Sequence, residues 1–158
     1  MVNNQIYKGE NTQNINMHPG DRNGSPDESF NSTLVFIDAG FLSKLSRYFG
    51  AGKFLIYDIL CFAQNIAKKE KLICKRTFYY TAPPFQSDNP TKEEERRKEG
   101  YDKFVKKLKQ KGILVREGRC QRLKIKGNYI YNQKAVDILM AIDLMEVPLK
   151  FSRIKKII

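Results

Sequence analysis

A short, unbroken apolar run, Leu34-Val35-Phe36-Ile37, follows a polar N-terminal stretch and ends at Asp38. Consecutive apolar residues without alternation are typical of a strand buried on both faces of a parallel sheet. Segments with a helical spacing of apolar residues then alternate with further β-rich runs along the chain. This alternation predicts an α/β fold, with a mostly parallel sheet flanked by helices.

Local signals predict where the elements begin and end. Asp58 is expected to cap a helix over 59–69, and Thr91 with Glu94 fits a capping box at the start of a helix over 91–111. A nearly all-apolar helix is expected over 134–145, buried on all sides and ending before Pro148. The other expected elements are a helix over 41–49, strands over 75–81, 113–115 and 154–158, and a hairpin over 119–133 with its turn at Gly127-Asn128.

The 158 residues correspond to about one domain. Residues 1–32 are rich in Asn, Gly, Ser, Pro and Asp and predict a disordered polar tail, which leaves 33–158 as the folded domain. The sequence has no apolar run long enough to span a membrane and no secretory signal. Its three cysteines are far apart, which predicts reduced thiols in a cytoplasmic protein rather than a disulfide framework or a zinc site.

The chain is strongly basic, with a net charge of +12. Residues 1–32 hold two basic against four acidic residues, so the domain carries +14. Such a domain attracts polyanions, and we expect RNA as its partner, although a basic surface that only aids solubility is the alternative. The expected contacts lie in and around the hairpin, where cations can bind phosphates and tyrosine can stack on unpaired bases: Arg116, Arg119, Arg122, Lys124, Lys126, Lys134 and Tyr129.

Three aspartates occur in apolar surroundings. Asp38 ends the buried strand, and Asp137 and Asp143 interrupt the apolar helix. The only histidine is His18, which excludes most Ser-His and Cys-His catalysis. Carboxylates without histidine suit Mg²⁺ or Mn²⁺, and beside bound nucleic acid they indicate metal-assisted phosphodiester hydrolysis.

Each aspartate also has a structural interpretation. Asp38 could cap the following helix, and Asp137 could complement the dipole of its own helix. Asp143 is six residues from Asp137, about 120° around the helix axis, so the two cannot point at one spot. We therefore expect Asp38 and Asp137 to share a site, with Asp143 as a supporting group, a cap or a ligand at the rim.

Four segments, in order, resemble motifs of one family. Residues 36–42 (FIDAGFL) resemble the opening FIDGxNL motif of NYN domains, which belong to the PIN-like nuclease superfamily. Residues 79–81 (YYT) and 112–118 (GILVREG) are similar to the second and third strands of these domains, and 133–144 (QKAVDILMAIDL) to their KGVDVxLAxDL helix. The LabA-like branch is the nearest.

The resemblance implies a Rossmann-like, PIN-like fold and divalent-metal-dependent RNA cleavage, with catalytic and metal-site roles for Asp38, Asp137 and Asp143. Residues 39–41 (AGF) replace the Gly-x-Asn of the family. NYN domains also continue past their fourth strand into an SGDxDF motif, whereas this sequence ends at Ile158, so we expect a truncated domain whose endoribonuclease activity requires acids supplied by that motif. The alternative function is a non-catalytic RNA-binding or scaffold module, as a monomer or a homo-oligomer.

Overall fold

The computed structural model of the protein describes residues 31–151 and 153–158. The predicted tail, including His18, lies outside the described residues except for its last two positions. In chain order the elements are β1 (Ser32–Asp38), α1 (Ala39–Phe49), α2 (Ile59–Lys69), β2 (Ile73–Thr81), α3 (Lys92–Gln110), β3 (Leu114–Glu117), β4 (Arg119–Ile125), β5 (Asn128–Lys134), α4 (Val136–Lys150) and β6 (Lys156–Ile157).

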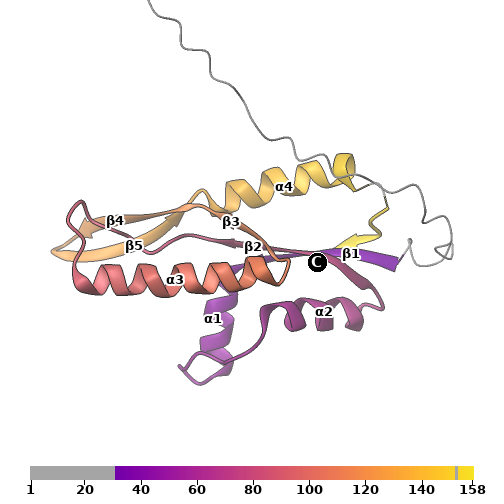
Figure 1. Ribbon diagram of the computed structural model, residues 1–158, viewed down its shortest axis with the longest axis horizontal. Helices are drawn as coiled ribbons and strands as arrows, with labels where there is room; N and C mark the ends of the chain where they lie inside the picture. Colours follow the sequence, from indigo (N-terminus) through magenta and orange to yellow (C-terminus); the bar gives the residue numbers. More distant parts are fainter. Residues whose placement is uncertain (1–30, 152) are drawn as a thin grey trace, which may run out of the picture.

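Four parallel strands form the central sheet, in the order β3-β2-β1-β6. Helices α1, α2 and α3 cover one face of this sheet and α4 covers the other (Figure 1). Strands β4 and β5 form a separate antiparallel hairpin that projects beyond the sheet beside α3 (Figure 1). The predicted α/β fold is thus confirmed, and its architecture is compatible with a Rossmann-like fold.

Strand β1 is buried on both faces, as its apolar run predicts. Val35 and Ile37 belong to a core cluster with residues of α1, α2 and α3. Leu34 and Phe36 lie on the opposite face, in a cluster that includes Val136 of α4. Because successive side chains of a strand point to opposite faces, this one strand holds the two helical layers together.

The helix caps follow the local signals. Asp58 accepts hydrogen bonds from the amides of Leu60 and Cys61, both 3.0 Å long, at the start of α2. Thr91 and Glu94 form the reciprocal capping box at the start of α3. These bonds satisfy amides that have no partner within the helix, so the predicted starting points of both helices are confirmed.

Three expectations need correction. The hairpin turn is Lys126-Gly127, one residue earlier than predicted, and both residues have positive φ angles, of 49° and 84°, as a two-residue turn of type I′ requires. Helix α4 continues through Pro148 to Lys150, because a proline in the last turn removes only one backbone hydrogen bond. This helix is also not buried on all sides, since Met145 and Leu149 face outward and are largely exposed.

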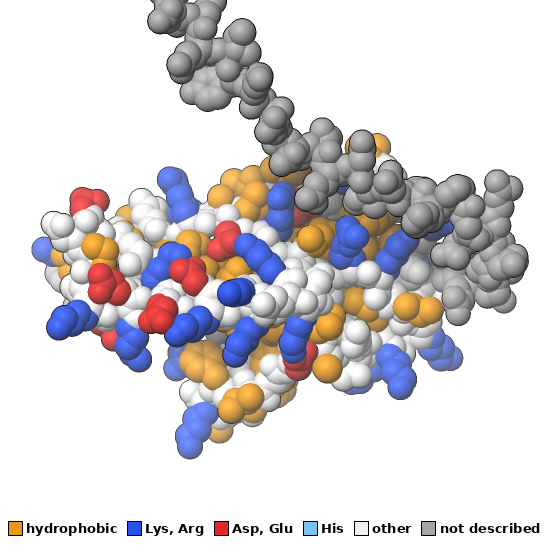
Figure 2. Space-filling view, in the orientation of Figure 1, with side chains coloured by type: hydrophobic (Ala, Val, Ile, Leu, Met, Phe, Trp, Pro, Cys, Tyr) orange, Lys and Arg blue, Asp and Glu red, His pale blue; other side chains and the backbone are white. Residues whose placement is uncertain are grey.

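The described helices include none that is both long and apolar enough to cross a membrane. On the face of the molecule that Figure 2 shows, Lys and Arg side chains are widely spread, whereas acidic side chains lie mainly along α3. Several of these acids are paired within the helix, including Glu93 with Arg96, Glu99 with Lys103, and Asp102 with Lys98. The acidic charge of α3 is therefore largely matched by its own cations.

Candidate nucleic-acid interface

Asp38 lies at the carboxyl end of β1, where the order of the sheet reverses, since β2 and β3 lie on one side of this strand and β6 on the other. Ligands of open α/β sheets bind at such positions. The Oδ1 atom of Asp38 accepts a hydrogen bond of 3.0 Å from the amide of Phe41 and caps α1. Its other oxygen, Oδ2, accepts no hydrogen bond from the described residues and faces no cation within ion-pair distance among them.

Asp137 is exposed in the first turn of α4. Its neighbour Val136 lies beside Gly118, whose amide donates a 2.8 Å hydrogen bond to the carbonyl of Thr81 at the end of β2. The start of α4 therefore lies at the same edge of the sheet as Asp38. The carboxylate of Asp137 also lies near the positive end of the helix dipole, as its structural interpretation expects.

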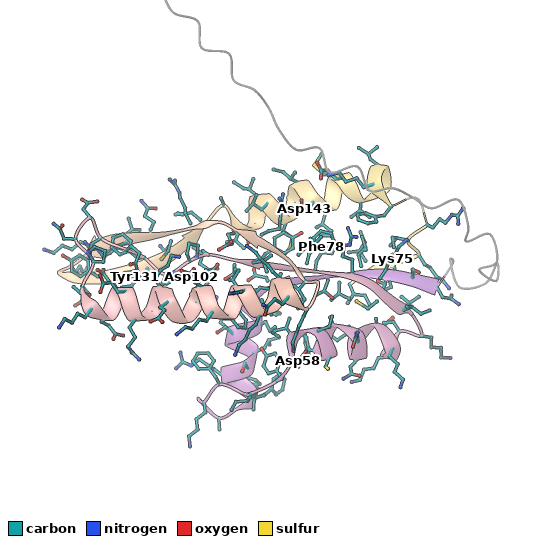
Figure 3. All side chains as sticks on the ribbon, viewed as in Figure 1. Asp58, Lys75, Phe78, Asp102, Tyr131 and Asp143 are labelled. Carbon is teal, nitrogen blue, oxygen red and sulfur yellow. The ribbon has the colours of Figure 1, made fainter. Side chains whose placement is uncertain are left out.

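Asp143 lies on the side of α4 that faces the sheet (Figure 3). Arg116 donates to it from Nε and Nη2, at 2.8 and 2.9 Å, and the hydroxyl of Tyr80 donates at 2.9 Å. These charge-assisted hydrogen bonds compensate the loss of water around a carboxylate that is 9% exposed. Both oxygens of Asp143 are thus engaged, and the carboxylate fastens α4 to β2 and β3.

Both oxygens of Asp143 accept hydrogen bonds from Arg116 or Tyr80. Of the three predicted metal ligands, Asp38 and Asp137 are therefore the two with carboxylate oxygens available for a metal ion. Within residues 31–151 and 153–158, no three His, Cys, Asp or Glu side chains form a group that could hold a metal ion. Two carboxylates supply only part of the oxygen shell that Mg²⁺ or Mn²⁺ requires. Binding of either ion stays a prediction.

The hairpin presents one face that combines cations with tyrosines. Cross-strand register places Lys124 opposite Tyr129, Arg122 opposite Tyr131, and Cys120 opposite Gln133. Residues that face each other in a pair point to the same side, so these six side chains share a face, here called the tyrosine face. Tyr129 and Tyr131 are 54% and 46% exposed.

Two of the predicted RNA-binding cations make internal contacts. Arg116 is held by Asp143, and the guanidinium of Arg122 lies between the rings of Phe85 and Tyr129, 4.4 and 4.6 Å from their centroids. Arg122 also lies 3.9 Å from the buried carboxylate of Glu94. The cations whose side chains remain exposed are Arg119, Lys124, Lys126 and Lys134.

A cavity of about 520 Å³ opens beyond the carboxyl ends of β1 and β2. Gly40, Lys44 and Arg47 of α1 line it, together with Phe54 of the following loop and Gln133 of β5. Sequence analysis missed this site because its residues come from separate parts of the chain. The spacing of Lys44 and Arg47 on one side of the helix that follows Asp38 is the signal that could have found it.

Tyr79 also lines this cavity. Burial, with smaller contributions from the nearby Tyr57 hydroxyl and Asp38 carboxylate, raises the pKa of its hydroxyl to about 12. Burial also raises the pKa of Tyr57. Both hydroxyls are therefore neutral and able to donate hydrogen bonds at physiological pH.

With this geometry defined, comparison with known proteins adds no relative. The chain matches no protein-family model, no curated protein and no solved structure.

Proposed function

We propose that this protein binds single-stranded RNA and that the tyrosine face of the hairpin makes the principal contact. The observation that carries the proposal is the pair of half-exposed rings, Tyr129 and Tyr131, on the same face as Lys124. Every unpaired base offers a flat face to an aromatic ring, and stacking of this kind is independent of base sequence. A polar coating that only aids solubility would not require exposed aromatic rings beside the cations.

The ring of Tyr129 is held in position before any ligand arrives. Arg122 packs against it at 4.6 Å, and the Lys124 ammonium lies 6.0 Å from its centroid. A fixed ring loses little conformational entropy when a base stacks on it. Lys126 lies in the turn at one end of the hairpin, and Arg119 and Lys134 face each other at the other end, on the opposite side of the ribbon. These exposed cations add positive charge around the hairpin, which favours binding of a phosphate backbone.

The test is fluorescence anisotropy of a labelled single-stranded RNA titrated with the full chain at several salt concentrations. Tyr129→Ala and Tyr131→Ala should each weaken binding about tenfold through lost stacking. Lys124→Ala should reduce the slope of log affinity against log salt by about one. Lys68→Ala, which removes the same charge from α2, is the matched control. Equal affinities for the wild type and both tyrosine variants would contradict the proposal.

A second candidate is metal-dependent cleavage of the bound RNA, as the resemblance to PIN-like NYN domains implies. The observation that favours it is Asp38, which lies at the carboxyl end of β1, shares its edge of the sheet with Asp137 and has an Oδ2 atom that accepts no hydrogen bond from the described residues. A hard divalent cation bound there would supply an activated water and stabilise charge on phosphate oxygens. Asp38 and Asp137 are the residues that would hold it.

Asp38→Asn separates this candidate from a structural role, because Asn caps a helix as well as Asp does but carries no charge. Cleavage of single-stranded RNA with Mn²⁺ should be lost in this variant while its thermal stability is kept. Equal cleavage by the wild type and the variant would refute the role of Asp38. Titration calorimetry with Mn²⁺ alone provides the second measurement, since an absence of heat at millimolar metal favours a module that binds RNA without cleaving it.

A further inference from the structure

We infer that the cavity beyond β1 and β2 binds one unpaired nucleotide, with the base against Phe54 and the phosphate on Lys44 and Arg47. The inference rests on the proposed RNA binding and adds a second, enclosed subsite to the open tyrosine face. At about 520 Å³ the cavity falls within the usual size range of small-ligand sites. Its place beyond the carboxyl ends of parallel strands is where ligands of such sheets bind.

The charges of the cavity select an anion. Among the described residues that line it, the charged ones are Lys44 and Arg47, and both are cations. They lie three residues apart on α1, so their side chains emerge on neighbouring positions of one helix surface. A guanidinium beside an ammonium is a common arrangement for contacting the oxygens of one phosphate group.

An aromatic platform lies beside these cations. Phe54 is 62% exposed, and the guanidinium of Arg47 lies 5.6 Å from the centroid of its ring. The loop that carries Phe54 is held against α1, because the amide of Leu55 donates a 2.7 Å hydrogen bond to the hydroxyl of Ser46. An exposed phenyl ring next to cations that can bind phosphate suits a nucleotide, because the base can stack on the ring while its phosphate contacts the cations. An inorganic anion would contact the cations but would not stack on the ring.

Other residues that line the cavity supply polar groups for the edge of a base. Gln133 lines the cavity, and a Cβ atom added to Gly40 would lie 3.3 Å from its Oε1 atom, so glycine at position 40 leaves room for this side chain. The amide of Gln133 can both donate and accept, and the neutral hydroxyl of Tyr79 can donate.

Gln133 also connects the cavity with the hairpin. It lines the cavity and lies on the tyrosine face, two and four residues from Tyr131 and Tyr129 along β5. Alternate residues of a strand point the same way, so the three side chains form one continuous row. A single RNA strand that stacks on the two tyrosines can therefore continue past Gln133 and place its next nucleotide in the cavity. This continuity favours RNA over an unrelated anionic ligand such as a phosphorylated peptide.

The experiment is ligand-observed NMR or calorimetry on the full chain at low salt, with 5′-UMP and 5′-AMP as probes. Uridine, adenosine and inorganic phosphate serve as partial ligands, and a short phosphotyrosine peptide serves as the competing class. Both nucleotides should bind more tightly than any partial ligand or the peptide. Phe54→Ala and Arg47→Ala should each weaken nucleotide binding about tenfold, and Lys68→Ala should leave it unchanged. Melting curves confirm that each variant is folded.

Three results would overturn the inference: no nucleotide binding at millimolar concentrations, equal binding by the wild type and both variants, or tighter binding of phosphate or the peptide than of nucleotides. Its failure is distinct from failure of the proposed function, because Tyr129→Ala reports on RNA binding by the hairpin alone. If Tyr129→Ala weakens RNA binding while Phe54→Ala and Arg47→Ala change nothing, the hairpin proposal stands and the cavity proposal falls. The reverse pattern would support the cavity alone.

Discussion

Arg116 of β3 and Asp143 of α4 form a two-point ion pair, with N–O distances of 2.8 and 2.9 Å, although 27 residues separate them in the chain. The pair ties the helix on one face of the sheet to an edge strand. Tyr80 of the neighbouring strand completes the arrangement through its hydroxyl group. These contacts give Asp143, an acidic residue in a largely apolar helix, a structural role in holding that helix on the sheet.

Removal of Arg116 should leave a buried carboxylate without its counter-ion. We expect Arg116→Ala to lower the free energy of unfolding by about 2 kcal/mol, less than for a fully buried pair because the Arg116 side chain is 42% exposed. Tyr80→Phe should cost about 1 kcal/mol, since it removes one hydrogen bond. Urea unfolding measures both. Arg116→Lys, which keeps the charge but not the two-point geometry, should fall between wild type and Arg116→Ala, and a full loss in this variant would contradict a charge contribution.

Two glycines predict opposite effects of the same substitution. A Cβ atom at Gly118 would lie 2.4 Å from the carbonyl oxygen of Lys134, so Gly118→Ala must move backbone at the base of the hairpin and should cost about 3 kcal/mol. Gly100 lies within α3 with nothing near its missing side chain, so Gly100→Ala should stabilise the protein by about 1 kcal/mol. Chemical denaturation of the two variants provides the comparison, and a stabilising Gly118→Ala would show that the close approach is absent.

The Asp58–Lys111 ion pair predicts loss of stability in acid. The hydrogen bond from Lys111, together with the amides of α2, lowers the pKa of Asp58 to about 2. Because the folded-state pKa lies below the unfolded value, the contribution of Asp58 is full above about pH 4 and disappears as the pH falls toward 2. Melting temperatures across this range should fall more steeply for the wild type than for Asp58→Asn. Parallel curves for the two proteins would contradict this assignment.

Tyr79 predicts the opposite limit, in alkali. Burial raises its pKa to about 12, above the unfolded value near 10, so the folded state resists ionisation of this hydroxyl. Its contribution is therefore full below about pH 10 and is lost as the pH rises toward 12. Tyr57, Tyr80 and Tyr101 also have raised pKa values, so phenolate absorbance should show a late-titrating component in the wild type that decreases by one tyrosine near pH 12 in Tyr79→Phe. A titration curve of the same shape in both proteins would rule out the shift.

Sequence reasoning predicted most of the elements because their signals are local. The cap at Asp58 and the box of Thr91 and Glu94 involve residues within one helical turn, and the apolar run before Asp38 reports burial of its own strand. Its errors also have local causes. Lys126 in the hairpin turn has a positive φ angle, which is uncommon for lysine and so was not expected from its residue type. Proline is typical of the end of a helix, but Pro148 lies in the last turn of α4, where it is tolerated.

For the candidate sites, too, local properties could be predicted from the sequence, whereas contacts between distant segments could not. The basic charge and a parallel α/β sheet whose first strand ends at Asp38 could be predicted from the amino acids alone, because composition and apolar period are properties of short stretches of chain. The contacts of Arg116 and Arg122 within the protein, the place of Asp143 between helix and sheet, and the cavity lined by Arg47, Phe54 and Gln133 became visible in the folded molecule. Ion pairs and cavities depend on which distant segments the fold brings within a few ångströms of one another, and no local pattern carries that information.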